Sequence, residues 1–384
     1  GGIRFAGTDT SSLTYAIIMG GHSATVGGGI YVGGAARVGL DHVTLWQNTA
    51  DQGGDASGPK TRYAAGITRT AVTAISNHFM AGSRGRVRLR RLGGILCYAG
   101  WRAQIDREGR TRMILVDAHM HIWDRIDGRL GGDRVLPTGN GKTRIGDAEV
   151  LMMPPGFTDS RVPAETALAY FDDAGVHVGV VVQEYMDGSQ NEYLVDVMRL
   201  HPDRFFCHAL LDFYNPAGCL AEYARVKEMG FRGVKVPAGH LCAADPRVRI
   251  DDPEIMHVYA AMDADGMVLS VDLAGGDAQV EELSNIARAH PGLSVVLGHF
   301  AMANRPAWME QLRLCKLPNV YVESGGICWL FRDEGIEFAG AQEAIRVARD
   351  EVGADKIMWG SDLPRTMVDF TYRQLLDFAR YGCD

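Results

Sequence analysis

Residues 113–384 are predicted to fold as an α/β protein of the (β/α)8 type, a TIM barrel. The first observation is that eight short apolar runs alternate with helical runs of about 10 to 15 residues, a pattern typical of parallel βα units. The second is that no GxGxxG motif follows the first apolar run, which disfavours an open doubly wound sheet. The third is that polar residues interrupt the runs at their C-terminal ends, where a barrel gathers its catalytic groups.

The eight strands are expected on apolar, β-branched runs. They are Ile114–Ala118, Val178–Glu184, Phe205–Leu211, Gly233–Val236, Met267–Asp272, Ser294–His299, Asn319–Glu323 and Lys356–Asp362. The helices are expected between them, at Pro163–Ala174, Asn191–Leu200, Pro216–Met229, Pro253–Asp265, Ala278–His290, Pro306–Cys315, Ala341–Glu351 and Phe370–Arg380. The segment Asp124–Arg161 is interpreted as a long loop over the first strand, because it has no motif that assigns it.

The first strand ends in Asp117-Ala-His-Met-His. Side chains two residues apart on a strand face the same way, so His119 and His121 are expected to enter the barrel mouth together. There they can share one metal ion. Equally, they can be a pair of hydrogen-bonded histidines at a strand end.

Five further residues are candidates for binding substrate. Glu184 ends the second strand and is interpreted as a substrate-facing acid, or as a structural carboxylate that orients a histidine. Lys235, in the fourth strand, is expected to anchor a substrate carboxylate or to form a salt bridge. His240 follows that strand and either lines the mouth or is an ordinary loop histidine. Trp329 and Arg365 are expected to shape the pocket, from their positions alone.

The segments Val116-Asp-Ala-His-Met-His, Val295-Val-Leu-Gly-His and Ile357-Met-Trp-Gly-Ser-Asp-Leu-Pro resemble the first-, sixth- and eighth-strand motifs of the amidohydrolase-related (amidohydrolase 2) family. The resemblance covers residues 113–384 and implies a TIM-barrel enzyme. It implies that His119 and His121 are metal ligands. It also implies that Asp362 is both a ligand and the acceptor of a proton from water, while His299 polarises the substrate or transfers a proton.

The fifth strand departs from the family pattern. The family usually has a histidine ligand there, whereas this chain has Asp272 in Val268-Leu-Ser-Val-Asp. Either Asp272 replaces the histidine as an oxygen ligand, which gives two His and two Asp ligands, or metal binding is weakened or lost. The resemblance implies one divalent ion, zinc or manganese, although some lactonase relatives work without a metal.

The expected function is that of a metal-dependent hydrolase. A divalent ion lowers the pKa of bound water towards 7, which supplies hydroxide for attack on an amide, ester or lactone of a small molecule. A nonoxidative decarboxylase of the aminocarboxymuconate-semialdehyde decarboxylase type would use the same site. A metal-independent lactonase and a noncatalytic binding barrel are also compatible with these residues.

Residues 1–112 have a different composition. They carry 14 Lys and Arg against 6 Asp and Glu, whereas residues 113–384 carry 25 against 41. Their glycine-rich pattern resembles a fragment of a parallel β-helix, with too few coils for a stacked core. The basic run at 84–91 is interpreted as a solvated linker that does not bind nucleic acid. At the other end, the family usually continues further, so the barrel is expected to be C-terminally truncated.

No run of residues reaches the roughly 18 to 20 apolar residues of a membrane span. The seven cysteines are scattered and never in CxxC spacing, which is typical of reduced cysteines in the cytoplasm. We therefore predict a cytoplasmic enzyme with a small-molecule substrate and no membrane or nucleic-acid partner. Barrels of this family often pair, so a homodimer is compatible with the sequence.

Overall fold

The structure is a computed structural model. It describes residues 111–382, apart from 158 and 336, with side chains from residue 114. Before residue 111 it describes the backbone of strand segments within 3–57 and of β8 (Trp101–Ile105). There β1 (Ile3–Gly7) pairs in parallel with β4 (Ile30–Gly34), and β2 (Thr10–Met19) with β5 (Arg37–Trp46). The β-helix interpretation and the boundary at residue 113 stay predictions, and the basic run 84–91 lies outside the described residues.

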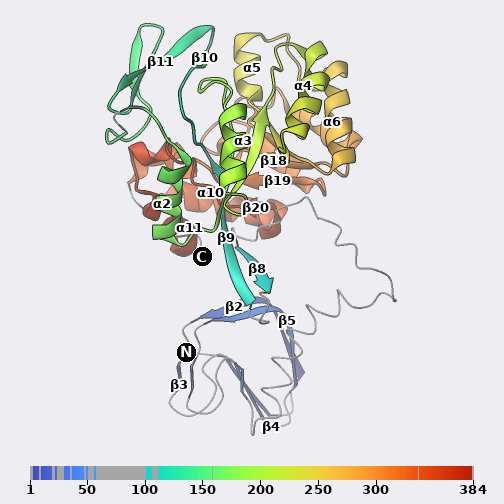
Figure 1. Cartoon of the computed structure of the whole chain (residues 1–384). Helices are drawn as coiled ribbons and strands as arrows, with labels where there is room; N and C mark the ends of the chain where they lie inside the picture. Colours follow the sequence, from blue (N-terminus) through green and yellow to red (C-terminus); the bar gives the residue numbers. More distant parts are fainter. Residues whose placement is uncertain are drawn as a thin grey trace. The chain divides into compact units, whose positions relative to one another are not determined.

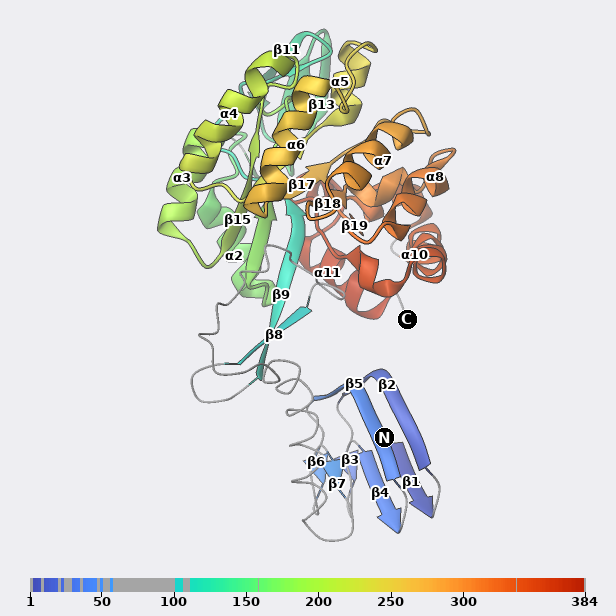
Figure 2. The same cartoon turned by 90° about the vertical axis from the view of Figure 1, so that its right-hand side faces the viewer.

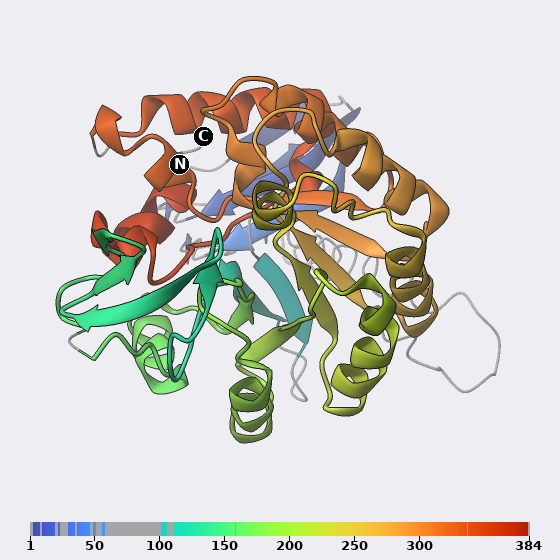
Figure 3. The ribbon, with the colours of Figure 1, turned by 90° about the horizontal axis from the view of Figure 1, so that it is seen from above.

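Eight parallel strands form a nearly closed barrel, which Figure 3 shows from above with helices around it. In order they are β9 (Thr111–Met120), β14 (Val178–Val181), β15 (Phe205–Leu210), β16 (Gly233–Val236), β17 (Val268–Val271), β18 (Ser294–Leu297), β19 (Val320–Glu323) and β20 (Ile357–Met358). The chain after β20 returns to β9, where the Ala118 amide donates to the Trp359 carbonyl at 2.9 Å. The predicted TIM barrel is confirmed.

Helices cover the outside of the strands (Figures 1 and 2). The principal helices are α2 (Ala164–Ala174), α3 (Asn191–Leu200), α4 (Pro216–Glu228), α6 (Pro253–Asp265), α7 (Val280–Ala289), α8 (Trp308–Leu312), α10 (Ala339–Val352) and α11 (Tyr372–Tyr381). Each lies within or close to an expected helical run. Two short helices were not expected, namely α5 (Ala238–Ala244) after β16 and α9 (Ile327–Leu330) after β19. No helix in the described part of the chain has the length and apolar character of a membrane-spanning segment.

The apolar side chains form two layers. A small inner cluster contains Val116, Val180 and Met358, which come from strands and fill the barrel. A larger outer cluster joins the other faces of the strands to helix residues such as Phe171 and Tyr259. This division is typical of a TIM barrel, in which the interior is packed and the catalytic groups lie at the C-terminal ends of the strands.

A β-bulge in β9 changes which face its residues occupy. Asp117 pairs with Gly179 and Met120 pairs with Val181, so β9 has one more residue than β14 over the same interval. As a result, Leu115 and Met120 both pack in the outer cluster although they are five residues apart. Bulges are known to redirect side chains beside active sites. Without this one, strict alternation from Val116 and Ala118 would point His119 and His121 away from the barrel interior.

The segment interpreted as a long loop is a four-stranded antiparallel sheet, visible above the barrel in Figure 1. Its strands are β10 (Arg129–Leu130), β11 (Asp133–Gly139), β12 (Lys142–Ile145) and β13 (Ala148–Leu151). The turn between β11 and β12 is Asn140-Gly141, and both residues have positive φ, 52° and 75°. Asn-Gly in a two-residue hairpin is a strong turn signal. The loop interpretation was therefore wrong because this signal was overlooked.

The eighth strand is shorter than predicted. The expected run reached Asp362, but β20 ends at Met358. Asp362 has a φ of 57°, in the left-handed region that a regular strand excludes. The chain therefore leaves the sheet before the residue that carries the predicted chemistry.

Candidate active site

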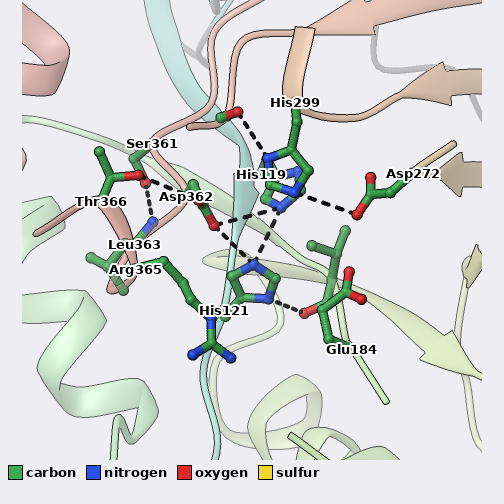
Figure 4. Close-up of polar contacts among 12 residues, drawn as sticks. His119, His121, Glu184, Asp272, His299, Ser361, Asp362, Leu363, Arg365 and Thr366 are labelled. Carbon is green, nitrogen blue, oxygen red and sulfur yellow. Dashed lines mark hydrogen bonds and ion pairs between the residues drawn. The ribbon is translucent and has the colours of Figure 1, made fainter. Parts of the chain in front are cut away.

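Three predicted ligands meet at the mouth of the barrel (Figure 4). His119 and His121 lie at the end of β9, and Asp362 lies after β20. The two Nε2 atoms are 3.2 Å apart, and Asp362 Oδ1 lies 3.1 Å from His121 Nε2 and 3.9 Å from His119 Nε2. All three side chains are buried, and they form a group with the spacing of metal ligands.

The other ring nitrogens indicate what this group can hold. His121 Nδ1 lies 3.0 Å from the Val182 carbonyl, which can only accept, so Nδ1 carries a proton. His119 Nδ1 lies 2.8 Å from Glu323 Oε1. In neutral imidazoles with protonated Nδ1, both Nε2 atoms are acceptors. Two nitrogen lone pairs and a carboxylate oxygen converge here, and no donor of the described residues lies between them. Such a set of acceptors fits a bound cation such as Zn²⁺ or Mn²⁺.

Glu323, at the end of β19, positions His119 and His299. Its Oε1 accepts from the backbone N–H of His299 at 2.8 Å as well as contacting His119, and its Oε2 accepts from the Gly325 N–H at 2.5 Å. Burial is the main cause that lowers the pKa of His119 well below its ordinary value, and the charge of Lys235 adds to it. His119 is therefore neutral at pH 7, as a metal ligand must be.

Asp362 is held from two sides. The Thr366 hydroxyl lies 3.3 Å from Asp362 Oδ2. The backbone N–H of Asp362 donates to the His119 carbonyl at 2.8 Å. Burial opposes ionisation of Asp362, but its contact with the His121 ring and the charge of His299 outweigh it and lower its pKa to about 2. The carboxylate is therefore ionised at neutral pH.

A second buried network ties the Asp362 turn to β9. Asp117 Oδ1 accepts from the backbone N–H of Ser361 at 2.8 Å, and its Oδ2 accepts from the Ser361 hydroxyl at 2.5 Å and the Tyr372 hydroxyl at 2.9 Å. Because Asp117 is two residues from His119 and Ser361 precedes Asp362, this network fixes the strand carrying the histidines relative to the carboxylate.

The opposite side of the mouth holds a lysine between carboxylates. Lys235, on β16, is 0% exposed, and its Nζ lies 2.5 Å from Asp272 Oδ2 and 3.4 Å from Glu184 Oε1. His240 Nδ1 lies 3.3 Å from Glu184 Oε2. Burial opposes the charge on Lys235, but Asp272 and Glu184 raise its pKa above the ordinary value. The structure thus brings four predicted site residues into one ionic cluster.

His299 lies between the two groups. Its Nε2 is 3.4 Å from Asp272 Oδ2, and its ring centroid is 4.7 Å from that of His119. Burial opposes protonation of His299, but neighbouring carboxylates, Asp272 foremost, raise its pKa to about 10. Its φ is 51°, and the next three residues have similar positive values. Such strain is common at functional sites.

Arg365 and Trp329 occupy different surroundings. The Arg365 guanidinium forms an ion pair with buried Asp187 and lies 5.0 Å from the centre of the Trp123 ring. Figure 4 places it beside His121. Trp329 lies on α9 and is 38% exposed. Its contact with substrate stays a prediction.

Sequence reasoning left three residues out of the predicted site. Glu323 entered the prediction only as the end of the seventh strand, whereas it contacts His119 and the backbone of His299. Asp187 and Asp117 were given no role, because their partners Arg365 and Ser361 are 178 and 244 residues away in sequence. The available signal was the position of Glu323 at a strand end and of Asp117 two residues before His119.

Comparison with known proteins gives one family. Residues 116–383 match the family model described as Amidohydrolase. The L-fucono-1,5-lactonase of Burkholderia ambifaria is 28% identical over 203 residues, which cover 50% of this chain. The match spans 66% of the length of that relative.

Two solved structures share the fold. One, from Acinetobacter baumannii, is described as a probable 2-pyrone-4,6-dicarboxylic acid hydrolase with citric acid bound. It is 16% identical, with a TM-score of 0.52, and the match covers 69% of this chain and 92% of that one. The other is a Burkholderia multivorans amidohydrolase with bound zinc, 19% identical, with a TM-score of 0.52 and coverage of 70% and 91%. The family model spans well over half of this sequence, and this chain belongs to the amidohydrolase family of enzymes.

Proposed function

We propose that this chain is a metal-dependent hydrolase that opens a lactone, with other esters and amides as the broader substrate class. One observation carries the proposal. His119 Nε2, His121 Nε2 and Asp362 Oδ1 converge as acceptors at the barrel mouth with no donor of the described chain between them. The likeness to a lactonase supports the choice of a lactone.

His119, His121 and Asp362 are the proposed metal ligands. A bound divalent ion would lower the pKa of water and polarise the substrate carbonyl. Asp272 belongs to a second group of ligand-like atoms, with His119 and His299. Its role as a fourth ligand stays a prediction. His119 belongs to both groups, which supports that role, whereas the contact of Asp272 with Lys235 opposes it, because the lysine already neutralises the carboxylate.

The side chains supply the proton transfers. We propose that Asp362 accepts a proton from the attacking water as the water oxygen bonds to the lactone carbonyl carbon. The ring C–O bond then breaks, and its oxygen takes a proton from His299, so the net change is the addition of one water. Glu323 holds His119 and the His299 backbone in place. Glu184, Lys235, His240, Trp329 and Arg365 are the proposed substrate-binding residues.

The substrate is a small molecule, as the enzymatic family implies. We propose a cytoplasmic location, which the five free cysteines among the described residues support. A homodimer and the absence of nucleic-acid and membrane partners stay predictions.

The test combines metal content with the source of oxygen in the product. The purified full chain is analysed by plasma mass spectrometry, and lactones are then hydrolysed in ¹⁸O-labelled water. We expect near-stoichiometric zinc or manganese and one ¹⁸O in the product carboxylate. Release of carbon dioxide from an aromatic or enoic acid, without ¹⁸O incorporation, would instead favour a decarboxylase. Full lactone turnover in chain freed of metal would favour the metal-independent lactonase.

A further inference from the structure

Asp362 and Arg365 lie in one turn after β20. The backbone N–H of Thr366 donates to the Asp362 carbonyl at 3.2 Å, which closes the turn over the residues between them. Asp362 is a proposed metal ligand, and Arg365 lies within the closed turn. A contact that fixes Arg365 therefore also restrains the backbone that carries the Asp362 carboxylate.

Arg365 pairs with a buried carboxylate from another part of the barrel. Its guanidinium forms an ion pair with Asp187, in the loop after β14, and the two side chains are 15% and 3% exposed. The guanidinium also lies 5.0 Å from the centre of the Trp123 ring, whose indole N–H donates to the Ser160 carbonyl at 2.8 Å. Water screens a buried pair only weakly. Arg365 is therefore held between a carboxylate and a fixed aromatic ring.

Asp187 belongs to a loop that is itself fixed. Its carbonyl accepts from the Asp127 N–H at 3.0 Å and from the Gln190 side-chain amide at 3.2 Å. The Gln183 side chain accepts from the Gln190 N–H at 2.7 Å and donates to the His208 carbonyl on β15 at 2.7 Å. These hydrogen bonds join the two ends of the loop to each other and to the next strand. Asp187 is thus a fixed anchor for the arginine.

The segment from Val182 to Asp187 is connected to two of the proposed metal ligands. The Val182 carbonyl lies 3.0 Å from His121 Nδ1 and orients that ring directly. Asp187 holds Arg365, which Figure 4 shows beside His121, and through it restrains the turn of Asp362. The ligand atoms, His121 Nε2 and Asp362 Oδ1, are 3.1 Å apart. One segment after β14 therefore restrains both members of this pair.

We propose that Asp187 is a positioning residue of the metal site. It holds Arg365, and thereby the turn of Asp362, in the place from which the carboxylate can share an ion with His121. This role rests on the proposed function, because it takes His121 and Asp362 as ligands. Asp187 is 2% exposed and acts from behind the site, whereas Arg365 keeps its proposed contact with substrate.

The test measures the zinc affinity of the purified full chain. Bound metal is removed with a chelator, and Zn²⁺ is then titrated in competition with a chromophoric chelator. For Asp187→Asn we expect the Kd for Zn²⁺ to rise by about tenfold or more, as is typical when a residue that orients a ligand is lost. An unchanged Kd overturns the positioning role and leaves the proposed function standing. No binding of zinc or manganese by the unaltered chain overturns the proposed metal site, and the positioning role with it.

Asp251→Asn is the matched control. Asp251 pairs with Arg249, accepts from Asn285 of α7 on the outside of the barrel, and has a side chain that is 9% exposed. We expect both variants to lose stability in urea, but only Asp187→Asn to change the Kd for Zn²⁺. An equal rise of Kd in the control would show that zinc affinity follows stability alone, and would overturn the assignment.

A variant of both partners tests whether Asp187 acts through Arg365. Asp187→Leu/Arg365→Met removes the two charges together, so neither is left buried without a partner. The Asp362 turn loses its restraint in this variant too, so we expect the Kd for Zn²⁺ to rise at least as much as in Asp187→Asn. A Kd equal to that of the unaltered chain would overturn the positioning role, whether or not Asp187→Asn folds.

Discussion

The two sides of the barrel mouth balance their charges in different ways. On the side of β9 and β20, His119, His121 and Asp362 direct acceptor atoms at one another. On the side of β16 and β17, Lys235 lies 2.5 Å from Asp272 and neutralises it from within the chain. The first side would take a cation from solution, as we propose, whereas the second carries its own. Within one barrel mouth, a carboxylate therefore lies against two histidine nitrogens at one place and against a lysine of the same chain at another.

The largest expected effect comes from removing the acceptors of the first side. His119→Ala/His121→Ala takes away two of the three proposed ligands, so we expect loss of bound metal and a fall in kcat/KM of at least about 10³-fold. Plasma mass spectrometry and lactone turnover measure the two effects. His201→Ala, at the C-terminal end of α3, is the control and should retain both. Full metal content in the double variant would show that the ion binds elsewhere, and would contradict the proposed difference between the two sides of the mouth.

The second prediction removes the internal cation of the other side. Lys235→Met removes the fully buried cation that Asp272 and Glu184 share and leaves only His299 beside Asp272 and His240 beside Glu184, so we expect a loss of about 3 kcal/mol in the free energy of unfolding. Lys227→Met, in an exposed pair with Asp265, should cost about 1 kcal/mol or less. Urea denaturation of the two variants gives the comparison. Similar losses in both would show that the buried pair has no special role.

The third prediction uses His208, which lies in β15 near Lys235. Burial, followed by the Lys235 charge, lowers the pKa of His208 to about 3, from an ordinary 6.5. Between these values the unfolded chain binds the extra proton, so this residue's contribution to stability falls as pH decreases from 6.5 to 3. Between pH 7 and 5 that contribution should fall by about 2 kcal/mol.

Urea unfolding at the two pH values measures the effect, and His208→Gln should remove that part of the pH dependence. Lys235→Met should shrink it, because the neighbouring charge that helps to lower the pKa is gone. An unaltered pH dependence in His208→Gln would mean that another group is responsible.

The smallest expected effect concerns the contact between the Thr366 hydroxyl and Asp362. Thr366→Val removes the hydroxyl that lies 3.3 Å from Asp362 Oδ2. We expect kcat to fall by roughly two- to fivefold, as for loss of one modest hydrogen bond, with metal content unchanged. Thr138→Val, which removes a hydroxyl from an exposed contact with Glu149, should leave kcat unaltered. A loss of metal in Thr366→Val would show that the hydroxyl supports the ligand set itself.

Much of the barrel could be predicted from local patterns. The apolar runs and the helices between them lie close to β14 (Val178–Val181), α3 (Asn191–Leu200) and their equivalents in the structure. The antiparallel sheet β10–β13 was missed, because its strands are short and half-exposed and only Asn140-Gly141 marks its turn. A strand that is buried on both faces appears in the sequence as a continuous apolar run, and these largely exposed strands have no such run.

The sequence by itself determined which chemical groups stand at the ends of the barrel strands, because strand ends and polar interruptions are local features of the chain. The tertiary structure alone decided where those groups point and what they pair with. The bulge in β9 turns His119 and His121 inward, and it exists only through pairing with β14. Likewise, Lys235 meets Glu184 and Asp272 across three different strands. Such pairings depend on register and closure of the barrel, which join residues too far apart for any sequence period to relate.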